Sequence, residues 1–464
     1  MKLIYGVKDK PKFGQLIVFA IQQLLAIMAA TLVVPVIING NIETFIADGT
    51  VAWQAGTWMS PAAALFGAGV GTLVYLLFTK FRSPVFLGSS FAFLGSMAAA
   101  FAGAVSMAAG FAGLIIGAVF AGLVYVVIAI IVKIAGVNWI NKLMPAAVIG
   151  PTVAIIGLSL AGNAVGDLQK GGVSSAHPLI CVLVGLVTLV IVILCATYGK
   201  KMTRLIPFIL GILGGYALAT IFTVIGNVAG IDALKVIDFT KISSLWANGI
   251  GIETFLTIPD FTFVEAIKGV KEIDGAYIAT LAVAYLPVAF VVFAEHIADH
   301  KNISSIIESD LLEDPGLSRT LLGDGVGSMF GAFFGGCPNT TYGESVGCVA
   351  ITGNASVYTI LTAALLAILI SFIAPFVAFV NSIPSCVMGG VCMALYGFIA
   401  VSGLKMVQKV DLNQNKNLFV VSTILISGIG GLTLNFGKVT ITAVACALIL
   451  GIIVNIIVSK AKEQ

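Results

Sequence analysis

Long runs of apolar residues, separated by charged and turn-forming residues, dominate this chain. A membrane-spanning helix needs about 20 mostly apolar residues, and fourteen such runs can be placed. They are 13–38, 61–79, 84–107, 110–132, 144–165, 178–197, 205–226, 276–297, 320–336, 340–353, 355–380, 384–403, 418–434 and 440–459. The pattern predicts an all-α polytopic membrane protein with 14 transmembrane segments.

The composition excludes a large soluble domain. Hydrophobic residues make up 59% of the 464 residues and charged residues only 10%, against about 25% charged in typical globular proteins. The net charge of +3 is too small to indicate a nucleic-acid partner. Seven scattered cysteines include no CxxC pair and predict neither a disulfide framework nor a metal site.

The basic residues predict the orientation in the membrane. If the amino terminus is inside, 18 of the 24 Lys and Arg residues fall in cytoplasmic loops and tails. The first apolar run, 13–38, is uncharged and too long for a signal-peptide core, so we expect it to remain as a span. We therefore expect a multi-pass protein of the plasma membrane, embedded in the lipid bilayer, with both termini in the cytoplasm.

Two short motifs recur at about half the chain length. Pro145-Ala-Ala-Val-Ile-Gly matches Pro384-Ser-Cys-Val-Met-Gly, and the motif at Pro84 matches the one at Pro338. The separations are 239 and 254 residues (384 − 145 and 338 − 84). Seven spans per half is an odd number, so the second half would enter the membrane from the opposite side. The repetition predicts two inverted 7-segment repeats.

The third and tenth segments each place a proline before Gly, Ser or Thr, where a helix cannot begin at once. A half-helix starting there has free N–H groups, which are costly in hydrocarbon unless they face protein, water or a ligand. Paired interrupted segments point to a transporter's binding site. Kinks that serve only packing are the alternative.

Two acidic residues in predicted spans stand out, Glu295 and Glu344. A carboxylate near the middle of a membrane costs about 2.5–3.5 kcal/mol on insertion scales, so a proton, a pore or a partner must offset it. For Glu295 the alternative is a solvated position at the cytoplasmic helix end. Glu344 has Gly, Ser and Val as neighbours, which makes that alternative weaker.

Four ionisable residues follow one another at helical spacing in the eighth segment. Glu295 and Asp299 are four residues apart, as are His296 and His300, so each pair shares a helix face. Repulsion between two stacked acids favours holding a proton on one of them. The spacing of the histidines could suit zinc, but no third ligand is evident. We expect no metal site and no cofactor.

Several of these motifs, taken in order over nearly the whole chain, resemble the nucleobase–ascorbate transporter family, and within it the uracil permeases most closely. The motifs are Gln22, Leu87-Gly-Ser-Ser-Phe91-Ala-Phe93, Ala294-Glu295-His296, Asp314-Pro-Gly-Leu, Pro338-Asn-Thr-Thr-Tyr342-Gly-Glu344 and Val387-Met-Gly-Gly…Tyr396-Gly. The family signature is present as Glu344-Ser345-Val-Gly347-Cys-Val-Ala-Ile-Thr352-Gly353.

The chain departs from the family pattern at three positions. Ser345 replaces the signature asparagine, and Gln23 stands where family members have a histidine in the first span. Asp299 stands where some uracil permeases have a histidine four residues after the glutamate.

The resemblance implies a core domain from segments 1–4 and 8–11, and a gate domain from segments 5–7 and 12–14. The corresponding ranges are 1–143 and 276–380 for the core, 144–226 and 381–464 for the gate, and 227–275 for an extracellular connection. Short β-strands are implied in segments 3 and 10. A homodimer and an elevator-like movement of core against gate are implied as well.

The implied activity is import of uracil by proton symport, without any enzymatic reaction. Glu295 and Glu344 would bind the ring N–H groups of uracil, and the backbone N–H groups of Phe91 and Gly343 its carbonyls. Tyr342 and Tyr396 would line the site. Glu295 would carry the coupling proton, with Asp299, His296 or His300 as relay.

Other functions remain open. A xanthine, urate or other purine permease of the same family is the nearest alternative, and Na+ is the alternative coupling ion. An anion exchanger of related fold would not retain two acids near the half-helix ends. A membrane-embedded enzyme would need a nucleophile–base pair or a metal cluster, and the sequence shows neither. The acids within the spans also disfavour a passive channel.

Overall fold

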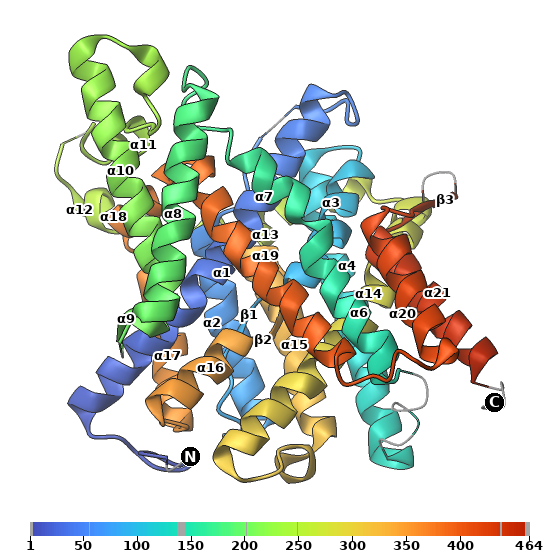
Figure 1. Cartoon of the computed structure of the whole chain (residues 1–464). Helices are drawn as coiled ribbons and strands as arrows, with labels where there is room; N and C mark the ends of the chain where they lie inside the picture. The colour runs from blue at the N-terminus through green and yellow to red at the C-terminus, as the bar shows by residue number, and fades with distance from the viewer. Residues whose placement is uncertain are drawn as a thin grey trace.

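The computed structural model describes residues 3–54, 56–136, 139, 144–200, 202–247, 249–436 and 439–459, and shows a bundle of helices (Figure 1). Eight stretches among these residues are helical, long enough and apolar enough to cross a membrane. They are α1 (Phe13–Ala47), α2 (Pro61–Phe78), α4 (Met107–Ala135), α6 with α7 (Ala146–Ser159 and Ala161–Asp167), α8 (Pro178–Tyr198), α10 (Pro207–Ala229), α14 (Gly275–Ile307) and α19 (Ser385–Val407).

The other six predicted ranges contain helices that are shorter or less apolar. These are η1 with α3 (Phe91–Phe93 and Leu94–Ala102), α15 (Leu317–Gly335), α16 (Gly343–Thr352), α17 with α18 (Val357–Ile370 and Ala374–Ser382), α20 (Asn415–Ile429) and α21 (Ala443–Val458). All fourteen predicted ranges thus contain helix. The fourteen-crossing inverted arrangement and its division into core and gate stay predictions.

Short elements connect the longer helices. Between α10 and α14 the chain forms η2 (Asp232–Leu234), α11 (Thr240–Ser243), η3 (Ser244–Trp246), α12 (Ile252–Phe255), α13 (Thr262–Gly269) and η4 (Val270–Glu272). The turn α9 (Met202–Leu205) precedes α10, and η5 (Leu312–Gly316) precedes α15. The predicted domain limits at residues 1, 143 and 464 lie outside the described residues.

Two short strands meet in the middle of the bundle. β1 (Leu87–Ser89) pairs antiparallel with β2 (Asn339–Thr341), with Gly88 opposite Thr340. The short strands implied for segments 3 and 10 are therefore present. They bring together two segments that are about 250 residues apart in the sequence (338 − 84 = 254).

A second strand pair was not predicted. β3 (Leu434–Phe436) pairs antiparallel with β4 (Val439–Ile441), so α20 ends before residue 434 and α21 starts after residue 440. The apolar pattern predicts helices, and no strand, in this region. Val439, Thr440 and Ile441 are all β-branched, which favours a strand over a helix.

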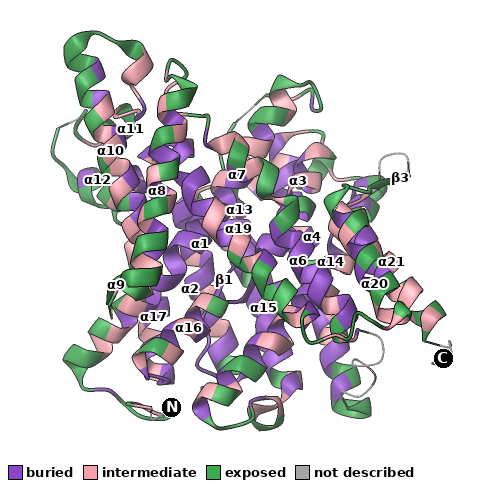
Figure 2. Cartoon of the chain, in the orientation of Figure 1, coloured by how far each residue is buried: buried purple, intermediate pink, exposed green. Residues whose placement is uncertain are grey.

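Burial separates the central helices from the peripheral ones. In the most apolar window of each helix, 72% of residues are buried in α1 and 67% in α2, but only 28% in α8 and 33% in α10. Figure 2 shows the same contrast, with exposed residues along α8 and buried residues in the middle of the bundle. Because the exposed side chains of α8 and α10 are apolar, these helices have the surface of lipid-facing helices.

Small residues bring α2 and α15 into backbone contact. A Cβ added at Gly67 would lie 2.5 Å from the carbonyl oxygen of Gly331, and one at Gly71 would lie 2.8 Å from that of Gly327. Such small-residue interfaces let helices in membranes pack closely. Asn339 at the start of β2 donates from Nδ2 to the Gly67 oxygen at 3.2 Å. The pair of helices α2 and α15 therefore directly supports the β1–β2 strand pair.

Candidate functional site

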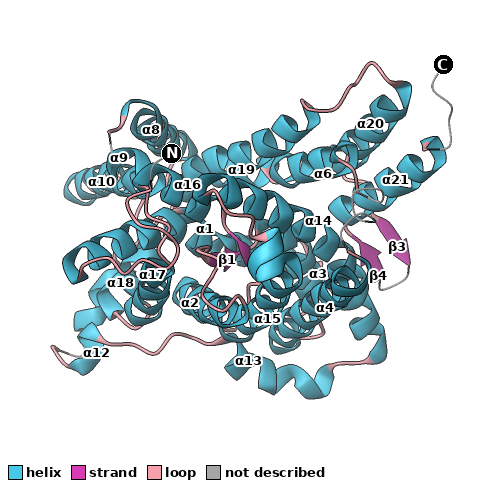
Figure 3. Ribbon diagram, turned by 90° about the horizontal axis from the view of Figure 1, so that it is seen from below, coloured by secondary structure: helices cyan, strands magenta, loops and turns pink. Residues whose placement is uncertain are grey.

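Each strand of the central pair leads into a helix start. Phe91 follows β1 and begins η1, while Gly343 follows β2 and begins α16. The strands are antiparallel, so the two starts lie at opposite ends of the strand pair, which we call the crossing. Figure 3 shows β1 in the interior of the bundle, surrounded by helices. The first N–H groups of a helix have no acceptor within it, and they carry the positive end of the helix dipole. The crossing therefore offers donors to an electron-rich ligand from both sides.

A cavity of about 460 Å³ lies beside this crossing. One wall comes from the crossing, α14 and α16, and contains Ser90, Phe91, Tyr342 and Gly343. The other lining residues come from α1, α6, α8, α9, α10 and α19. The cavity thus separates the elements predicted as core from those predicted as gate.

Three carboxylates lie on the first wall: Glu295 and Asp299 of α14, and Glu344 of α16. Asp299 is 8% exposed, and its Oδ2 accepts a hydrogen bond of 2.9 Å from Thr341 Oγ1 at the end of β2. A Cβ placed on Gly343 would lie 3.8 Å from Asp299 Oδ1. The acid of α14 therefore lies next to the start of α16.

The alternative of Glu295 as a solvated helix end was wrong. Helix α14 continues to Ile307, ten residues beyond the predicted end at 297. Glu295 is only partly exposed and faces the cavity. The polar turns after residue 297 stay helical because Ile303 and Ile307 are buried in a hydrophobic cluster, while Lys301 and Asn302 are exposed.

Tyr342 is fixed across the strand pair. Its hydroxyl donates to the Ser89 carbonyl oxygen at 2.8 Å, and Thr31 Oγ1 of α1 donates to it at 3.4 Å. A Cβ at Gly88 would lie 2.4 Å from the Tyr342 ring. Glycine at position 88 is therefore needed for this ring to lie against β1.

Tyr396 lies behind the cavity wall. It is 3% exposed, and its ring packs edge-on against the ring of Phe91 with centroids 5.9 Å apart. Phe91 lines the cavity, whereas Tyr396 is not among the lining residues. The structure thus places Tyr396 where it supports Phe91.

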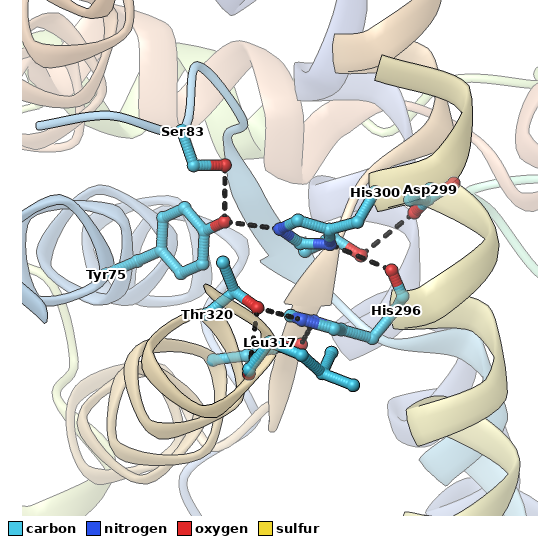
Figure 4. A network of polar contacts seen from close by, with 9 residues as sticks. Tyr75, Ser83, His296, Asp299, His300, Leu317 and Thr320 are labelled. Carbon is cyan, nitrogen blue, oxygen red and sulfur yellow. Dashed lines mark hydrogen bonds and ion pairs between the residues drawn. The ribbon is translucent and has the colours of Figure 1, made fainter. Parts of the chain in front are cut away.

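His296 and His300 of α14 are not among the residues that line the cavity. Figure 4 shows them in a network of polar contacts with Tyr75, Ser83 and Thr320. Both are fully buried, and their rings stack with centroids 4.0 Å apart. His296 Nδ1 lies 2.7 Å from Asp324 Oδ2 of α15, and its Nε2 lies 3.0 Å from Thr320 Oγ1. Asp324 is also fully buried.

The hydrogen-bond directions limit the protonation of this pair. Thr320 Oγ1 donates to the Leu317 carbonyl oxygen at 3.0 Å, so it accepts from His296 Nε2. One proton then lies between His296 Nδ1 and Asp324 Oδ2. Whether it is on the nitrogen or on the oxygen, the pair has no net charge, which lowers the cost of burying an acid.

His300 belongs to the same interior network. Its Nδ1 donates to the His296 carbonyl oxygen at 2.8 Å, so Nε2 of the neutral ring can accept from the Tyr75 hydroxyl at 2.7 Å. Ser83 Oγ lies 2.7 Å from that hydroxyl oxygen. Both nitrogens of each histidine are thus engaged with protein atoms.

Ser345, which replaces the signature asparagine, connects α1 to the strand crossing. Gln23 Nε2 donates to Ser345 Oγ, and the Phe86 backbone N–H donates to the same atom at 3.0 Å. Gln22 Nε2 contacts Met202 Sδ at 2.7 Å. Ser345 therefore accepts a hydrogen bond from the backbone N–H of Phe86, the residue just before β1, at the position where the family signature has asparagine.

The structure brings Glu295, Glu344, Phe91, Gly343 and Tyr342 to one wall, with Asp299 beside them. His296 and His300 do not line the cavity. Sequence reasoning misses Asp324, a third acid within a predicted span (320–336). Its signal is the charge in the apolar run, which the weak hydropathy of this glycine-rich segment obscures.

The wall combines carboxylate acceptors with backbone N–H donors around a partly apolar space. Such a set can bind a small polar ring that has both N–H and carbonyl groups. A nucleophile paired with a base does not occur among the described lining residues. The arrangement suits reversible binding.

Solved structures of transporters have a similar fold. The transmembrane domain of the cyanobacterial bicarbonate transporter BicA aligns with a TM-score of 0.57 at 14% identity, covering 97% of this chain and 100% of that one. Murine Slc26a9, an anion transporter, aligns with a TM-score of 0.63 at 11% identity, covering 97% of this chain and 69% of that one. At these identities the likeness concerns the fold alone.

Sequence relatives are much closer. The chain is 36% identical over 459 residues to the uracil permease of Bacillus caldolyticus, covering 98% of this chain and 95% of that protein. The uracil permeases of Bacillus subtilis (strain 168) and Escherichia coli (strain K12) are 35% and 34% identical, covering 100% and 97% of this chain and 97% and 93% of those proteins. The Permease family designated Xan_ur_permease matches residues 14–437. The chain therefore belongs to this family, the nucleobase–ascorbate transporter family, and is a membrane transporter, not an enzyme.

Proposed function

We propose that this protein imports uracil across the plasma membrane by proton symport. The observation that carries the proposal is the gathering of Glu295, Asp299 and Glu344 on one wall of the cavity, next to the helix starts at Phe91 and Gly343. The relatives named uracil permeases, similar over nearly the whole chain, support the choice of substrate.

Uracil matches this wall group by group. Its ring N–H groups donate to Glu295 and Glu344, and its carbonyl oxygens accept from the backbone N–H groups of Phe91 and Gly343. Each buried polar group of the neutral ring then has a partner, which avoids the cost of leaving one unpaired. Tyr342 closes the wall. An anion would meet repulsion from the same carboxylates, which disfavours anion exchange despite the shared fold.

The coupling proton is carried by Glu295, with Asp299 as relay. The two acids share a helix face on the cavity, so repulsion between them falls when one is protonated. His296 and His300 act from behind, by fixing α14 against α15, and no cofactor takes part. A Na+ gradient does not drive the transport.

Transport proceeds by an elevator-like movement. The core, residues 1–143 and 276–380, carries the polar wall and moves against the gate, residues 144–226 and 381–464, while 227–275 forms the outer connection. The exposed Arg204, Asn302 and Ser402 lie at the cavity rim, on the side predicted to be cytoplasmic. The state shown is then open to the inside. Both termini are cytoplasmic, and the protein is a homodimer.

The test is uptake of labelled uracil into proteoliposomes with imposed gradients. An inward proton gradient should drive accumulation above equilibrium, and an inward Na+ gradient at equal pH should not. A panel of unlabelled purines should compete poorly. Accumulation driven by Na+ alone, or better competition by a purine than by uracil, would contradict the proposal.

A further inference from the structure

The two walls of the cavity differ in chemistry. The wall formed by the crossing, α14 and α16 carries the three carboxylates and the helix starts. The lining residues from the predicted gate include five apolar side chains, which we call the apolar wall: Val153 and Ile156 of α6, Phe208 of α10, and Leu395 and Ile399 of α19. On this side the polar residues Arg204 and Ser402 are exposed at the rim.

The cavity is larger than a single small ring requires. Its volume of about 460 Å³ falls in the range of about 300–1,000 Å³ that is typical of sites for drug-sized ligands. A bound uracil ring therefore leaves part of the cavity unfilled.

Uracil has a polar arc and an apolar edge. The positions N1, C2, N3 and C4 form the arc of N–H and carbonyl groups, and C5 and C6 form the edge with only C–H groups. If the arc binds the polar wall, as in the proposed function on which this inference rests, the C5–C6 edge must point towards the apolar wall.

We propose that the site binds pyrimidinediones with an apolar substituent at C5 or C6 more tightly than uracil itself. The substituent packs against Ile156, Leu395 and Ile399 and gains affinity from burial. It also occupies the space between the two walls, so these ligands inhibit transport.

The same wall disfavours a polar extension. Xanthine extends the same ring edge with an imidazole ring, whose N–H and nitrogen lone pair would face Val153, Ile156 and Leu395. Buried polar groups without partners lose affinity. An alkyl group and an imidazole on one edge are therefore a matched pair of probes.

The experiment measures binding to the purified full-length protein by displacement of labelled uracil. The competitors are uracil, its 6-methyl, 6-ethyl and 6-propyl derivatives, and xanthine. We expect each added methylene to tighten binding by about fourfold, the equivalent of about 0.8 kcal/mol, and xanthine to bind at least tenfold more weakly than uracil. Progressive weakening along the alkyl series, or xanthine binding as tightly as 6-propyluracil, would overturn the inference.

Two variants locate the effect. Ile399→Trp fills the space at the apolar wall, so it should remove the advantage of 6-propyluracil over uracil. Val401→Trp on the same helix is the matched control, because Val401 is 47% exposed and does not line the cavity. It should keep the alkyl advantage, and thermal unfolding curves verify that both variants fold.

The outcomes separate this inference from the function beneath it. Wild-type protein that binds no uracil overturns both. Wild-type protein that binds and accumulates uracil, but shows no gain along the alkyl series, overturns only the inference. Loss of the alkyl advantage in Val401→Trp as well as in Ile399→Trp would likewise contradict the role of the apolar wall.

Discussion

The two faces of α14 carry ionisable side chains in two different settings. Glu295 and Asp299 face the cavity, where a ligand or water can reach them. His296 and His300, one residue further along, are fully buried and hydrogen-bonded to Asp324, Thr320 and Tyr75. Residues adjacent in sequence therefore have separate tasks: one face presents carboxylates to the cavity, and the other uses its ring nitrogens to hold the helix.

The comparison shows how a membrane protein can keep acids ready for a ligand. Carboxylates on a cavity need rigid support, because a helix free to rotate would turn them away. That support comes from the hydrogen bonds that join Tyr75 of α2, His296 and His300 of α14, and Thr320 and Asp324 of α15. Changes on the interior face should therefore lower stability, and changes on the cavity face should lower affinity and coupling.

The largest effect is expected from Asp324→Leu. It leaves His296 buried without its partner, and breaking such a pair costs about 3–5 kcal/mol. We expect a markedly lower unfolding temperature of the purified protein, with the protein that remains folded still binding uracil. The double variant His296→Leu with Asp324→Leu should be less destabilised than the two single effects combined, because no polar group is then left alone. Additive effects would show that His296 and Asp324 do not stabilise the protein as a pair.

Glu295→Gln should act on function instead of stability. The glutamine keeps an oxygen acceptor for the ring N–H but cannot take up a proton, so we expect uracil affinity to fall by no more than about tenfold, the equivalent of about 1.4 kcal/mol. Accumulation driven by a proton gradient should disappear, while the unfolding temperature should change little. Glu313→Gln, an exposed acid beyond the end of α14, is the control. Uphill uptake equal to wild type would remove Glu295 from proton coupling.

Thr341→Val tests the support of Asp299. The variant removes the hydrogen bond of 2.9 Å to Asp299 Oδ2, and a typical bond contributes about 0.5–1.5 kcal/mol. We expect uracil affinity to fall by roughly 3- to 10-fold, measured by equilibrium binding. The control is Thr352→Val, whose hydroxyl donates to the Cys348 carbonyl oxygen within its own helix. Equal affinity in both variants would mean that Asp299 does not need Thr341.

The smallest effect is expected from Tyr75→Phe on the interior face. It removes a hydroxyl shared by His300 and Ser83, so we expect a loss of stability of about 1 kcal/mol with unchanged uracil affinity. Tyr125→Phe is the control, since the Tyr125 hydroxyl is buried without a hydrogen-bond partner among the described residues. A change in affinity without a change in unfolding temperature would show that the interior face takes part in binding.

Much of the helix placement could be predicted, because a bilayer requires long apolar segments and charges mark their ends. The ends themselves could not always be predicted. Helix α14 continues to Ile307, since packing against neighbouring helices stabilises polar helical turns that hydropathy assigns to a loop. The β3–β4 pair was also beyond prediction, as its strands span three residues each and depend on pairing with each other.

The site was predictable in part for the same reason. Glu295 and Glu344 stood out because a carboxylate within an apolar run is costly to bury in a membrane. The helical periodicity placed Asp299 on the same face as Glu295. Asp324 escaped because its segment is rich in glycine and only weakly apolar. The helical periodicity could not show which face of α14 lines the cavity.

The order of residues is enough to identify a membrane protein, to locate two distant interrupted segments, and to place Glu295 and Glu344 within predicted spans. These follow from local properties: hydropathy, helix breaking and charge. The three-dimensional packing shows that β1 and β2 pair, that Glu295, Asp299 and Glu344 line one cavity, and that His296 pairs with Asp324. These depend on contacts between residues far apart in the chain, which the packing of whole helices brings together.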